Sequence, residues 1–315
     1  MDQAGGPEVL RYVERVLGEP PAGHVRVEVA AAGVNYADVY QRSGLYKTAL
    51  PYFPGGEGSG RVVAVAPDVS EVSIGQRVAW QGVPGSYATE AIVPAWQLIA
   101  VPDGITDEHA AALLLQGLTA HYLATSSYAV QPGDTILIHA GAGGAGLLLT
   151  QVARLLGARV ITTVSTRQKA DLSRQAGAAV VATYEDFESM VKRETDGRGV
   201  AAVYDSVGLA TFEGSLRSLT RRGTLVLFGQ SSGRVPPFDL GRLSEFGSLT
   251  VTRPTLRDFV GSSDELQQRA RDLFAWNRAG EVRVHIGRIY RLDDVASAHR
   301  DLEARSTTGK LLLRP

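Results

Sequence analysis

The sequence predicts an α/β protein with a doubly wound parallel sheet and a second, barrel-like β domain. Short apolar strands alternate with helical segments between residues 135 and 252, which is the pattern of βαβ units. Short strands separated by glycine and proline turns fill residues 22–120, which is typical of a small barrel. A chain of 315 residues is also long enough for two cores.

The β-rich part is predicted from alternating apolar residues. Strands are expected at His24–Ala30, Arg61–Ala66, Arg77–Gln81 and Ser86–Val93. Turn signals at Pro54-Gly55-Gly56 and Pro84-Gly85 lie between them.

The parallel sheet is predicted from six short strands. They are Thr135–His139, Arg159–Val164, Val180–Thr183, Val200–Asp205, Thr224–Phe228 and Ser248–Thr252. Helices are expected at Leu147–Leu156, Arg167–Ala176 and Phe187–Thr195.

The last part of the chain is expected to return to the first domain. Its predicted elements are the helix Asp264–Asn277, the strand Arg288–Arg291, the short helix Leu292–Glu303 and the strand Lys310–Leu313. The predicted domains are therefore residues 1–118 with 254–315, and residues 119–253.

Composition narrows the class of protein. The net charge of −1 supplies no basic surplus for nucleic acid or an anionic membrane. The absence of cysteine excludes disulfides, thiolate chemistry and cysteine-bound zinc. No apolar run is long enough to span a bilayer, and the first residues do not resemble a signal peptide. We therefore expect a cytoplasmic protein.

A glycine-rich turn follows the first strand of the parallel sheet. Gly141, Gly143 and Gly146 have the G-x-G-x-x-G spacing, with a strand before them and a helix after them. We expect Gly141 to permit the tight turn, Gly143 to let a pyrophosphate approach, and Gly146 to let the helix pack closely. This context predicts a Rossmann dinucleotide site, although a purely structural glycine turn has the same spacing. The residues expected to contact the phosphates are Gly141, Ala142, Gly143, Gly144, Ala145 and Gly146.

The end of the second strand predicts which dinucleotide binds. An NAD site usually has an acid there, and residues 164–169 contain none. Ser165 can donate a hydrogen bond, and Arg167 and Lys169 can supply positive charge, so the segment favours NADPH. The alternative is that Arg167 and Lys169 form a solvated first helical turn.

Four motifs together resemble one family. They are Gly133-Asp134 with the glycine turn, Gln151 and Arg154; the segment from Gly33 to Tyr46; Tyr204-Asp205-Ser206-Val207-Gly208; and the segment from Leu302 to Lys310. The chain resembles the zinc-free quinone oxidoreductase (zeta-crystallin-like) family of the medium-chain dehydrogenase/reductase superfamily. The resemblance implies a GroES-like catalytic domain, hydride or one-electron transfer from NADPH to a quinone, and a homodimer. The first strand of that family is shortened or absent here.

The resemblance also implies contacts with the cofactor. Lys169, Tyr184 and Arg305 match positions that hold the 2′-phosphate, and Asn35 and Thr119 match residues near the nicotinamide. Residues along the cofactor are Ser206, Phe228, Gly229, Ser231 and Ser232. The alternatives are that Tyr184 only caps a strand and that Arg305 is an ordinary surface charge.

The zinc ligands of related dehydrogenases are missing. Gly56 replaces the histidine of their Gly-His-Glu motif, and Asn35 replaces a cysteine. The six histidines show no ligand spacing, so no metal is predicted and most are expected to be ordinary surface or partly buried residues.

Without zinc, the predicted chemistry is reduction of a conjugated acceptor. A quinone or enone that takes hydride needs alignment and hydrogen bonds to its carbonyl oxygen. Asn35, Tyr40 and Tyr46 are candidates for these bonds, and solvent can supply the proton. Tyr40 and Tyr46 can equally be pocket lining, and Arg253 can line the cleft or join the domains.

Two other functions remain open at this point. One is an NADPH-dependent alkenal or enone reductase on the same scaffold. The other is a protein that binds NADPH without turnover.

Overall fold

The computed structural model describes residues 1–315, and they form two compact units. The first unit contains Met1–Gln116, Gly261–Phe274 and Val284–Pro315, and the second contains Gly117–Val260 and Ala275–Arg283. Two boundaries between the units fall inside helices α2 and α8, and the other two follow Val260 and Arg283. The prediction placed the boundaries after residues 118 and 253.

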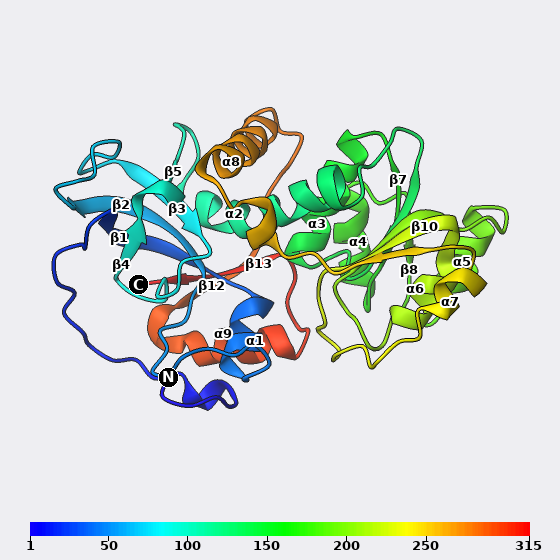
Figure 1. Cartoon of the computed structure of the whole chain (residues 1–315), viewed down its shortest axis with the longest axis horizontal. Helices are drawn as coiled ribbons and strands as arrows, with labels where there is room; N and C mark the ends of the chain where they lie inside the picture. Colours follow the sequence, from blue (N-terminus) through cyan, green and yellow to red (C-terminus); the bar gives the residue numbers. More distant parts are fainter. The chain divides into compact units, whose positions relative to one another are not determined.

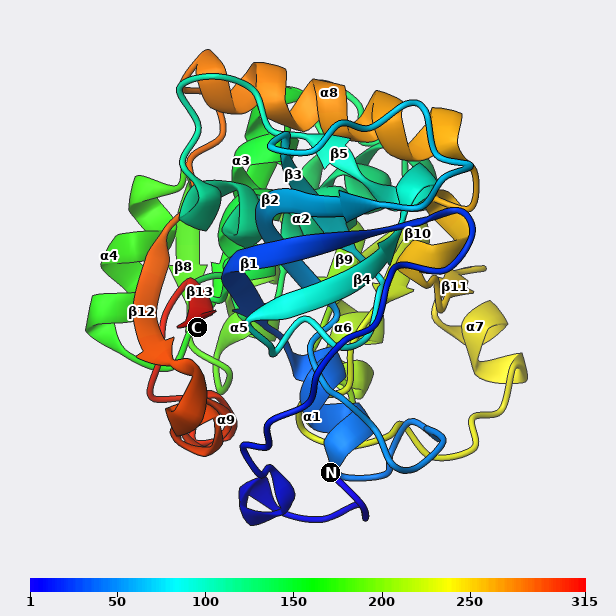
Figure 2. The same cartoon turned by 90° about the vertical axis from the view of Figure 1, so that its left-hand side faces the viewer.

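The first unit is built on a seven-stranded sheet. Its order is β12-β13-β1-β2-β3-β5. Strand β4 pairs with the amino-terminal half of β1, on the edge opposite β2. Figure 2 shows β1 with β2 and β4 on either side. The strands are β1 His24–Val34, β2 Glu57–Val65, β3 Arg77–Gln81, β4 Glu90–Pro94, β5 Ile99–Ala100, β12 Ile286–Arg291 and β13 Lys310–Arg314. The α-helices that begin in this unit are α1 Tyr36–Arg42, α2 Asp107–Tyr122, α8 Ser263–Arg278 and α9 Val295–Glu303.

Alternating valines fix the face that β1 buries. Val25, Val27 and Val29 are buried, and they pack in one core with Trp80 of β3. Because side chains alternate across a strand, this spacing directs all three valines to the same side. The carboxyl-terminal β13 then pairs with the second half of β1, so the last residues of the chain complete this sheet.

The second unit is a six-stranded parallel sheet in the order β11-β10-β9-β6-β7-β8. Its strands are β6 Thr135–Ile138, β7 Arg159–Thr163, β8 Val180–Ala182, β9 Val200–Asp205, β10 Leu219–Leu227 and β11 Thr250–Thr252. Its helices are α3 Gly144–Leu155, α4 Arg167–Gln175, α5 Phe187–Glu194, α6 Phe212–Ser218 and α7 Gly241–Glu245. The strand order reverses between β6 and β9, which confirms the predicted Rossmann arrangement.

Helices cover both faces of the parallel sheet. Helix α3 packs beside α4, and α5 packs beside α6 (Figure 1). The central strands β6 and β9 are buried, as their unbroken apolar sequences require. In such a sheet, ligands bind outside the carboxyl ends of the strands near the point where the order reverses.

Two parts of the β-rich prediction are wrong. Residues 107–122 form helix α2, which is apolar nearly all round and therefore lacks a helical stripe of apolar residues. The predicted strand Ser86–Val93 begins only at Glu90, because Ser86 belongs to a turn in which its hydroxyl accepts from Trp80 Nε1 at 2.9 Å. Residues 1–23 contain a short 3₁₀ helix at Pro7–Val9 and no strand.

Candidate functional site

The glycine turn connects strand β6 to helix α3 in the second unit. A Cβ atom on Gly141 would lie 2.5 Å from Thr162 Cβ, and one on Gly146 would lie 2.3 Å from the Ala140 carbonyl oxygen. Neither position has room for a side chain. A Cβ on Gly143 would meet only the Ala140 carbonyl oxygen, at 3.3 Å. The turn is therefore open at Gly143 and closed at the other two glycines.

The structure corrects the role predicted for Gly141. The left-handed residue of the turn is Ala140, with φ of 54°. Gly141 does not have a positive φ, and what it provides is the space that Thr162 of β7 and Ser173 of α4 occupy. The glycine is required for close packing and not for unusual backbone torsion angles.

The amino-terminal end of α3 fits a dinucleotide pyrophosphate. The helix begins at Gly144, and Gly143 at the N-cap supplies no side-chain hydrogen bond. The first amides of a helix have no acceptors within the helix, and the helix dipole places positive charge there. Because Gly143 also leaves the approach open, an anion can reach these amides directly.

Three of the residues predicted to contact the 2′-phosphate, Ser165, Lys169 and Tyr184, follow the ends of β7 and β8. Thr163 of β7 pairs with Ala182 of β8 in parallel register. Ser165 lies two residues after Thr163, and Tyr184 lies two residues after Ala182, so both follow the same edge of the sheet. Lys169 Nζ donates to Ser165 Oγ at 3.5 Å. The structure thus brings Ser165 and Lys169 together and places Tyr184 past the neighbouring strand.

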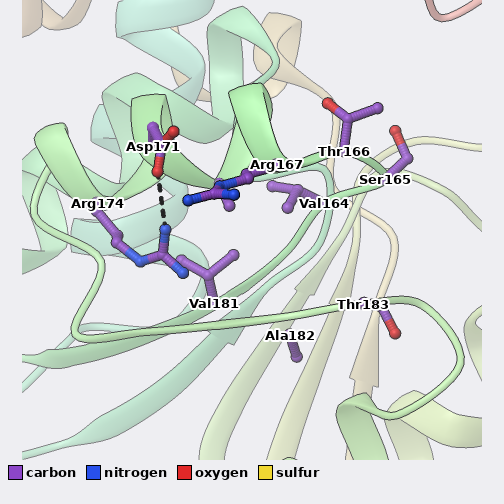
Figure 3. A pocket seen from close by; sticks show the side chains of 10 residues that line it. Val164, Ser165, Thr166, Arg167, Asp171, Arg174, Val181, Ala182 and Thr183 are labelled. Carbon is purple, nitrogen blue, oxygen red and sulfur yellow. Dashed lines mark hydrogen bonds and ion pairs between the residues drawn. The ribbon is translucent and has the colours of Figure 1, made fainter.

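A cavity of about 430 Å³ opens next to this edge of the sheet (Figure 3). It is lined by Val164, Ser165, Thr166, Arg167, Ala170, Asp171, Arg174, Val181, Ala182 and Thr183. Its only carboxylate, Asp171, accepts from Arg174 at 3.0 Å on the side away from Ser165 and Thr183. The remaining polar groups are hydroxyls and the Arg167 guanidinium, which suit a phosphate better than a ribose diol.

A second loop lies against the turn after β9. A Cβ on Gly229 would lie 2.5 Å from the Ser206 carbonyl oxygen, and the Ser231 amide donates to the same oxygen at 3.2 Å. Ser232 Oγ donates to the Val207 carbonyl oxygen at 2.7 Å. The structure therefore brings together four residues predicted along the cofactor, Ser206, Gly229, Ser231 and Ser232, with Phe228 at the start of the same loop.

Sequence reasoning missed a buried polar network beneath this edge. His139 contacts Thr163 Oγ1 at 2.9 Å through Nδ1 and Ser215 Oγ at 3.0 Å through Nε2. Ser215 Oγ in turn donates to Asp205 at 2.9 Å, and Thr211 donates to the same carboxylate at 2.7 Å. His139 is fully buried, whereas most of the histidines were predicted to be ordinary surface or partly buried residues. The only indication of this network in the sequence is that one polar residue, His139, stands at the end of an apolar strand.

The first unit contains another buried network around Asn35. Lys310 Nζ donates to Asn35 Oδ1 at 2.8 Å and forms a closer ion pair with Glu57 Oε1. Asn35 Nδ2 donates to Glu57 at 2.7 Å, and Gln116 Nε2 donates to Asn35 Oδ1 at 3.3 Å. Lys310 and Glu57 are 1% and 0% exposed, so this ion pair is inaccessible to water. Its partners are too far apart in sequence for a local motif to indicate it.

Asp38 extends this network beneath helix α1. Its carboxylate accepts from the Asn35 amide at 2.8 Å and from Tyr87 OH at 2.9 Å, and Tyr87 OH also contacts His299 Nε2 at 3.3 Å. Burial raises the pKa of Asp38 to about 6, against the opposing effects of its two donors and of Lys310. Burial together with Asp38 raises the pKa of Tyr52 to about 12, and burial lowers the pKa of His299 to about 4.

We expect the substitution Asp38→Asn to change how stability depends on pH. The raised pKa means that wild-type Asp38 favours the folded state fully below pH 3.8 and loses that contribution as the pH rises through 6. The shift of about two pKa units corresponds to about 3 kcal/mol. The free energy of unfolding of the variant, minus that of the wild type, should therefore increase by about 3 kcal/mol between pH 4 and pH 7.

Urea unfolding of both proteins across this pH range measures the difference. His299, Tyr87, Tyr52, Glu57 and Lys310 face this site and are present in both proteins, so the comparison with wild type isolates the effect of the Asp38 carboxyl group. A difference that does not change with pH would mean that Asp38 has an ordinary pKa.

The two predicted site tyrosines contact each other. The rings of Tyr40 and Tyr46 have centroids 5.1 Å apart in an edge-to-face arrangement. Tyr40 is buried and Tyr46 is 37% exposed, so only Tyr46 offers much surface to a ligand. Both belong to the first unit, as Asn35 does.

Three predicted site residues lie apart from these groups. Thr119 is a half-buried residue of α2, in the part that belongs to the second unit. Arg253 is exposed directly after β11 and donates to the Pro254 carbonyl oxygen at 3.5 Å. Arg305 is exposed after α9 in the first unit, with φ of 56°.

The donor groups around Asn35 do not suit a metal ion. Gly56 offers no side chain, and the oxygens of Asn35 and Glu57 already accept from the Lys310 ammonium group. No group of three or more histidine, aspartate or glutamate side chains in residues 1–315 has the arrangement of a metal site. Likewise, no helix is long and apolar enough to cross a membrane.

Comparisons with known proteins agree with both units. Residues 21–103 match the alcohol dehydrogenase GroES-like domain, and residues 144–276 match the domain described as zinc-binding dehydrogenase. A quinone oxidoreductase of Pseudomonas aeruginosa is 44% identical over 99% of this chain and 97% of its own length. The Escherichia coli quinone oxidoreductase solved with NADPH is 41% identical, with a TM-score of 0.98 over 100% of this chain and 98% of that one.

A relative with another named substrate is almost as similar. A 2-haloacrylate reductase of a Burkholderia species is 37% identical over 99% of this chain and 96% of its own length.

Proposed function

The chain belongs to the quinone oxidoreductase family, the zinc-free type within the medium-chain dehydrogenase/reductase superfamily, and from this membership we propose that it reduces quinones with NADPH. The structural observation that carries the cofactor part of the proposal is the turn at Gly143, which is open toward the uncapped amides of α3. NADPH supplies a hydride, and this chain supplies the binding and orientation of the reactants.

The second unit binds the cofactor in this proposal. The amides that follow Gly143 donate hydrogen bonds to the pyrophosphate, as they would to any anion at an open helix terminus. Ser165 and Lys169 bond the 2′-phosphate, and Tyr184 forms the neighbouring wall of that site. A carboxylate at this edge would repel a phosphate, and the cavity has only Asp171, which is bonded to Arg174. This arrangement supports NADPH over NADH.

The first unit orients the acceptor in this proposal. Asn35 is held by Lys310, Glu57 and Gln116, so its side chain has one fixed orientation. Tyr46, with Tyr40 behind it, offers a partly exposed ring that can stack against a flat acceptor. The contacts with the cofactor or the acceptor that were predicted for Thr119, Arg253 and Arg305 remain predictions.

An alkenal or enone reductase is the second candidate, and the haloacrylate reductase favours it. Both acceptors accept a hydride at a conjugated carbon and place negative charge on oxygen. A quinone site and an enone site therefore require similar hydrogen-bonding groups, and they differ mainly in shape. A protein that binds NADPH without turnover is the third candidate, and no structural feature favours it.

A panel of acceptors distinguishes the three candidates. We expect purified protein to oxidise NADPH faster with 1,4-quinones than with 2-alkenals or 2-haloacrylates at equal concentration, and EDTA should not change the rate. Quinone reduction at the rate without enzyme, beside rapid reduction of an enal, would replace the main proposal by the second. Tight binding of NADPH without consumption by any acceptor would favour the third.

We also propose that the enzyme is a cytoplasmic homodimer. Strand β11 is an edge strand that pairs only with β10, so its outer edge is available to a second copy. The cysteine-free sequence is compatible with a reducing compartment. Light scattering after gel filtration tests the dimer, and a monomer mass near 33.5 kDa would refute it.

A further inference from the structure

The Asp205 carboxylate determines which groups donate and which accept in the hydrogen bonds around His139. An ionised carboxylate only accepts, so Ser215 donates its proton to Asp205 and accepts from His139 Nε2. His139 Nδ1 is then the acceptor, and Thr163 donates to it. Burial lowers the pKa of His139, against the opposing charge of Asp205, which agrees with a neutral ring.

This network joins the carboxyl ends of three adjacent strands. His139 directly follows β6, Thr163 is the last residue of β7, and Asp205 is the last residue of β9. The Ala140 amide also donates to Thr163 Oγ1, at 3.4 Å, at the start of the glycine turn. The imidazole ring is therefore fixed at both nitrogens.

The ring of Tyr184 lies nearly parallel to the same imidazole. The two ring planes lie within 16° of each other, with centroids 6.2 Å apart. The imidazole and the Phe187 ring of α5 meet edge to face, with centroids 4.9 Å apart and planes at 89°. Tyr184 is half-buried, so His139 packs on one side of a residue that remains accessible on another.

We propose that His139 is a positioning residue for cofactor choice: it holds the Tyr184 ring in the place where that ring forms the wall of the 2′-phosphate site. The inference rests on the proposed use of NADPH. NADH lacks the 2′-phosphate, so a displaced Tyr184 affects NADPH more than NADH. His139 itself touches neither nucleotide.

The substitution His139→Gln tests this role. Glutamine keeps an amide donor for Ser215 and removes the ring that Tyr184 packs against. We expect the ratio of the NADH dissociation constant to the NADPH dissociation constant to fall about twofold to tenfold, the range for loss of one aromatic contact. The kcat with saturating NADPH should stay near the wild-type value, because the reacting atoms are unchanged.

Three further variants make the result decisive. Phe187→Leu removes the other ring contact of His139 and should leave the NADPH preference unchanged. Thr163→Val removes the hydrogen bond to His139 Nδ1 and keeps the ring. It should shift the preference for NADPH in the same direction as His139→Gln, and it tests the role even if His139→Gln does not fold. In a Tyr184→Ala background, His139→Gln should no longer change the preference, because the two residues act through one contact.

The outcomes separate this inference from the proposed function. If Tyr184→Ala leaves the preference for NADPH unchanged, the proposed 2′-phosphate site is wrong. If Tyr184→Ala lowers the preference but His139→Gln weakens NADPH and NADH equally, or changes neither, the positioning role is overturned and the site stands.

Discussion

Lys310→Met is expected to lower the free energy of unfolding by about 3–5 kcal/mol, the usual result of removing one partner from a buried ion pair. The substitution leaves the Glu57 carboxylate fully buried with hydrogen bonds from Asn35 and the Leu115 amide only. Those two donors do not replace the charge of the ammonium group. Urea unfolding at pH 7, followed by circular dichroism, measures the loss.

The double variant Glu57→Gln with Lys310→Met is the matched control. Its glutamine can still accept from the Leu115 amide and carries no charge, so most of the loss should be recovered. Equal losses in the single and double variants would show that packing, and not the unpaired charge, explains the effect. Little loss in Lys310→Met would contradict a stabilising role of the buried ion pair.

Lys169→Ala is expected to weaken NADPH binding by about 1.5–3 kcal/mol, the value of one charge-assisted hydrogen bond. The change corresponds to about a 10-fold to 150-fold increase in the dissociation constant, and NADH binding should be almost unchanged. Lys169 lies beside Ser165, past the end of β7, where a 2′-phosphate would be read. Titration calorimetry with both nucleotides measures the two affinities.

Arg174→Ala serves as a control from the cavity that Ser165 lines. Arg174 lines that cavity but bonds Asp171, so its removal should affect NADPH less than the loss of Lys169 does. Equal weakening of NADPH and NADH by Lys169→Ala would leave no basis for a 2′-phosphate contact at this position.

The parallel sheet could be predicted because its signals are local. Strand β9 matches its predicted bounds, Val200–Asp205, and the glycine turn lies between a strand and a helix as its spacing indicates. Helix α2 could not be predicted in the same way. Its residues are buried on nearly every face, and periodicity cannot separate such a helix from a run of buried strands.

The buried networks needed tertiary structure. Asn35, Glu57 and Lys310 come from three separate parts of the chain, and only the pairing of β1 with β2 and β13 brings them together. The glycine motif predicted where a pyrophosphate binds. It did not predict that Ala140 adopts the left-handed conformation, because the spacing of the glycines does not indicate that a non-glycine residue has a positive φ.

A crystal structure of the protein with bound NADPH tests the central claim most directly. We expect the pyrophosphate within hydrogen-bonding distance of the amides at the start of α3, beside Gly143, and the 2′-phosphate beside Lys169. NADPH bound at any other place, with side chains covering the turn at Gly143, would contradict it.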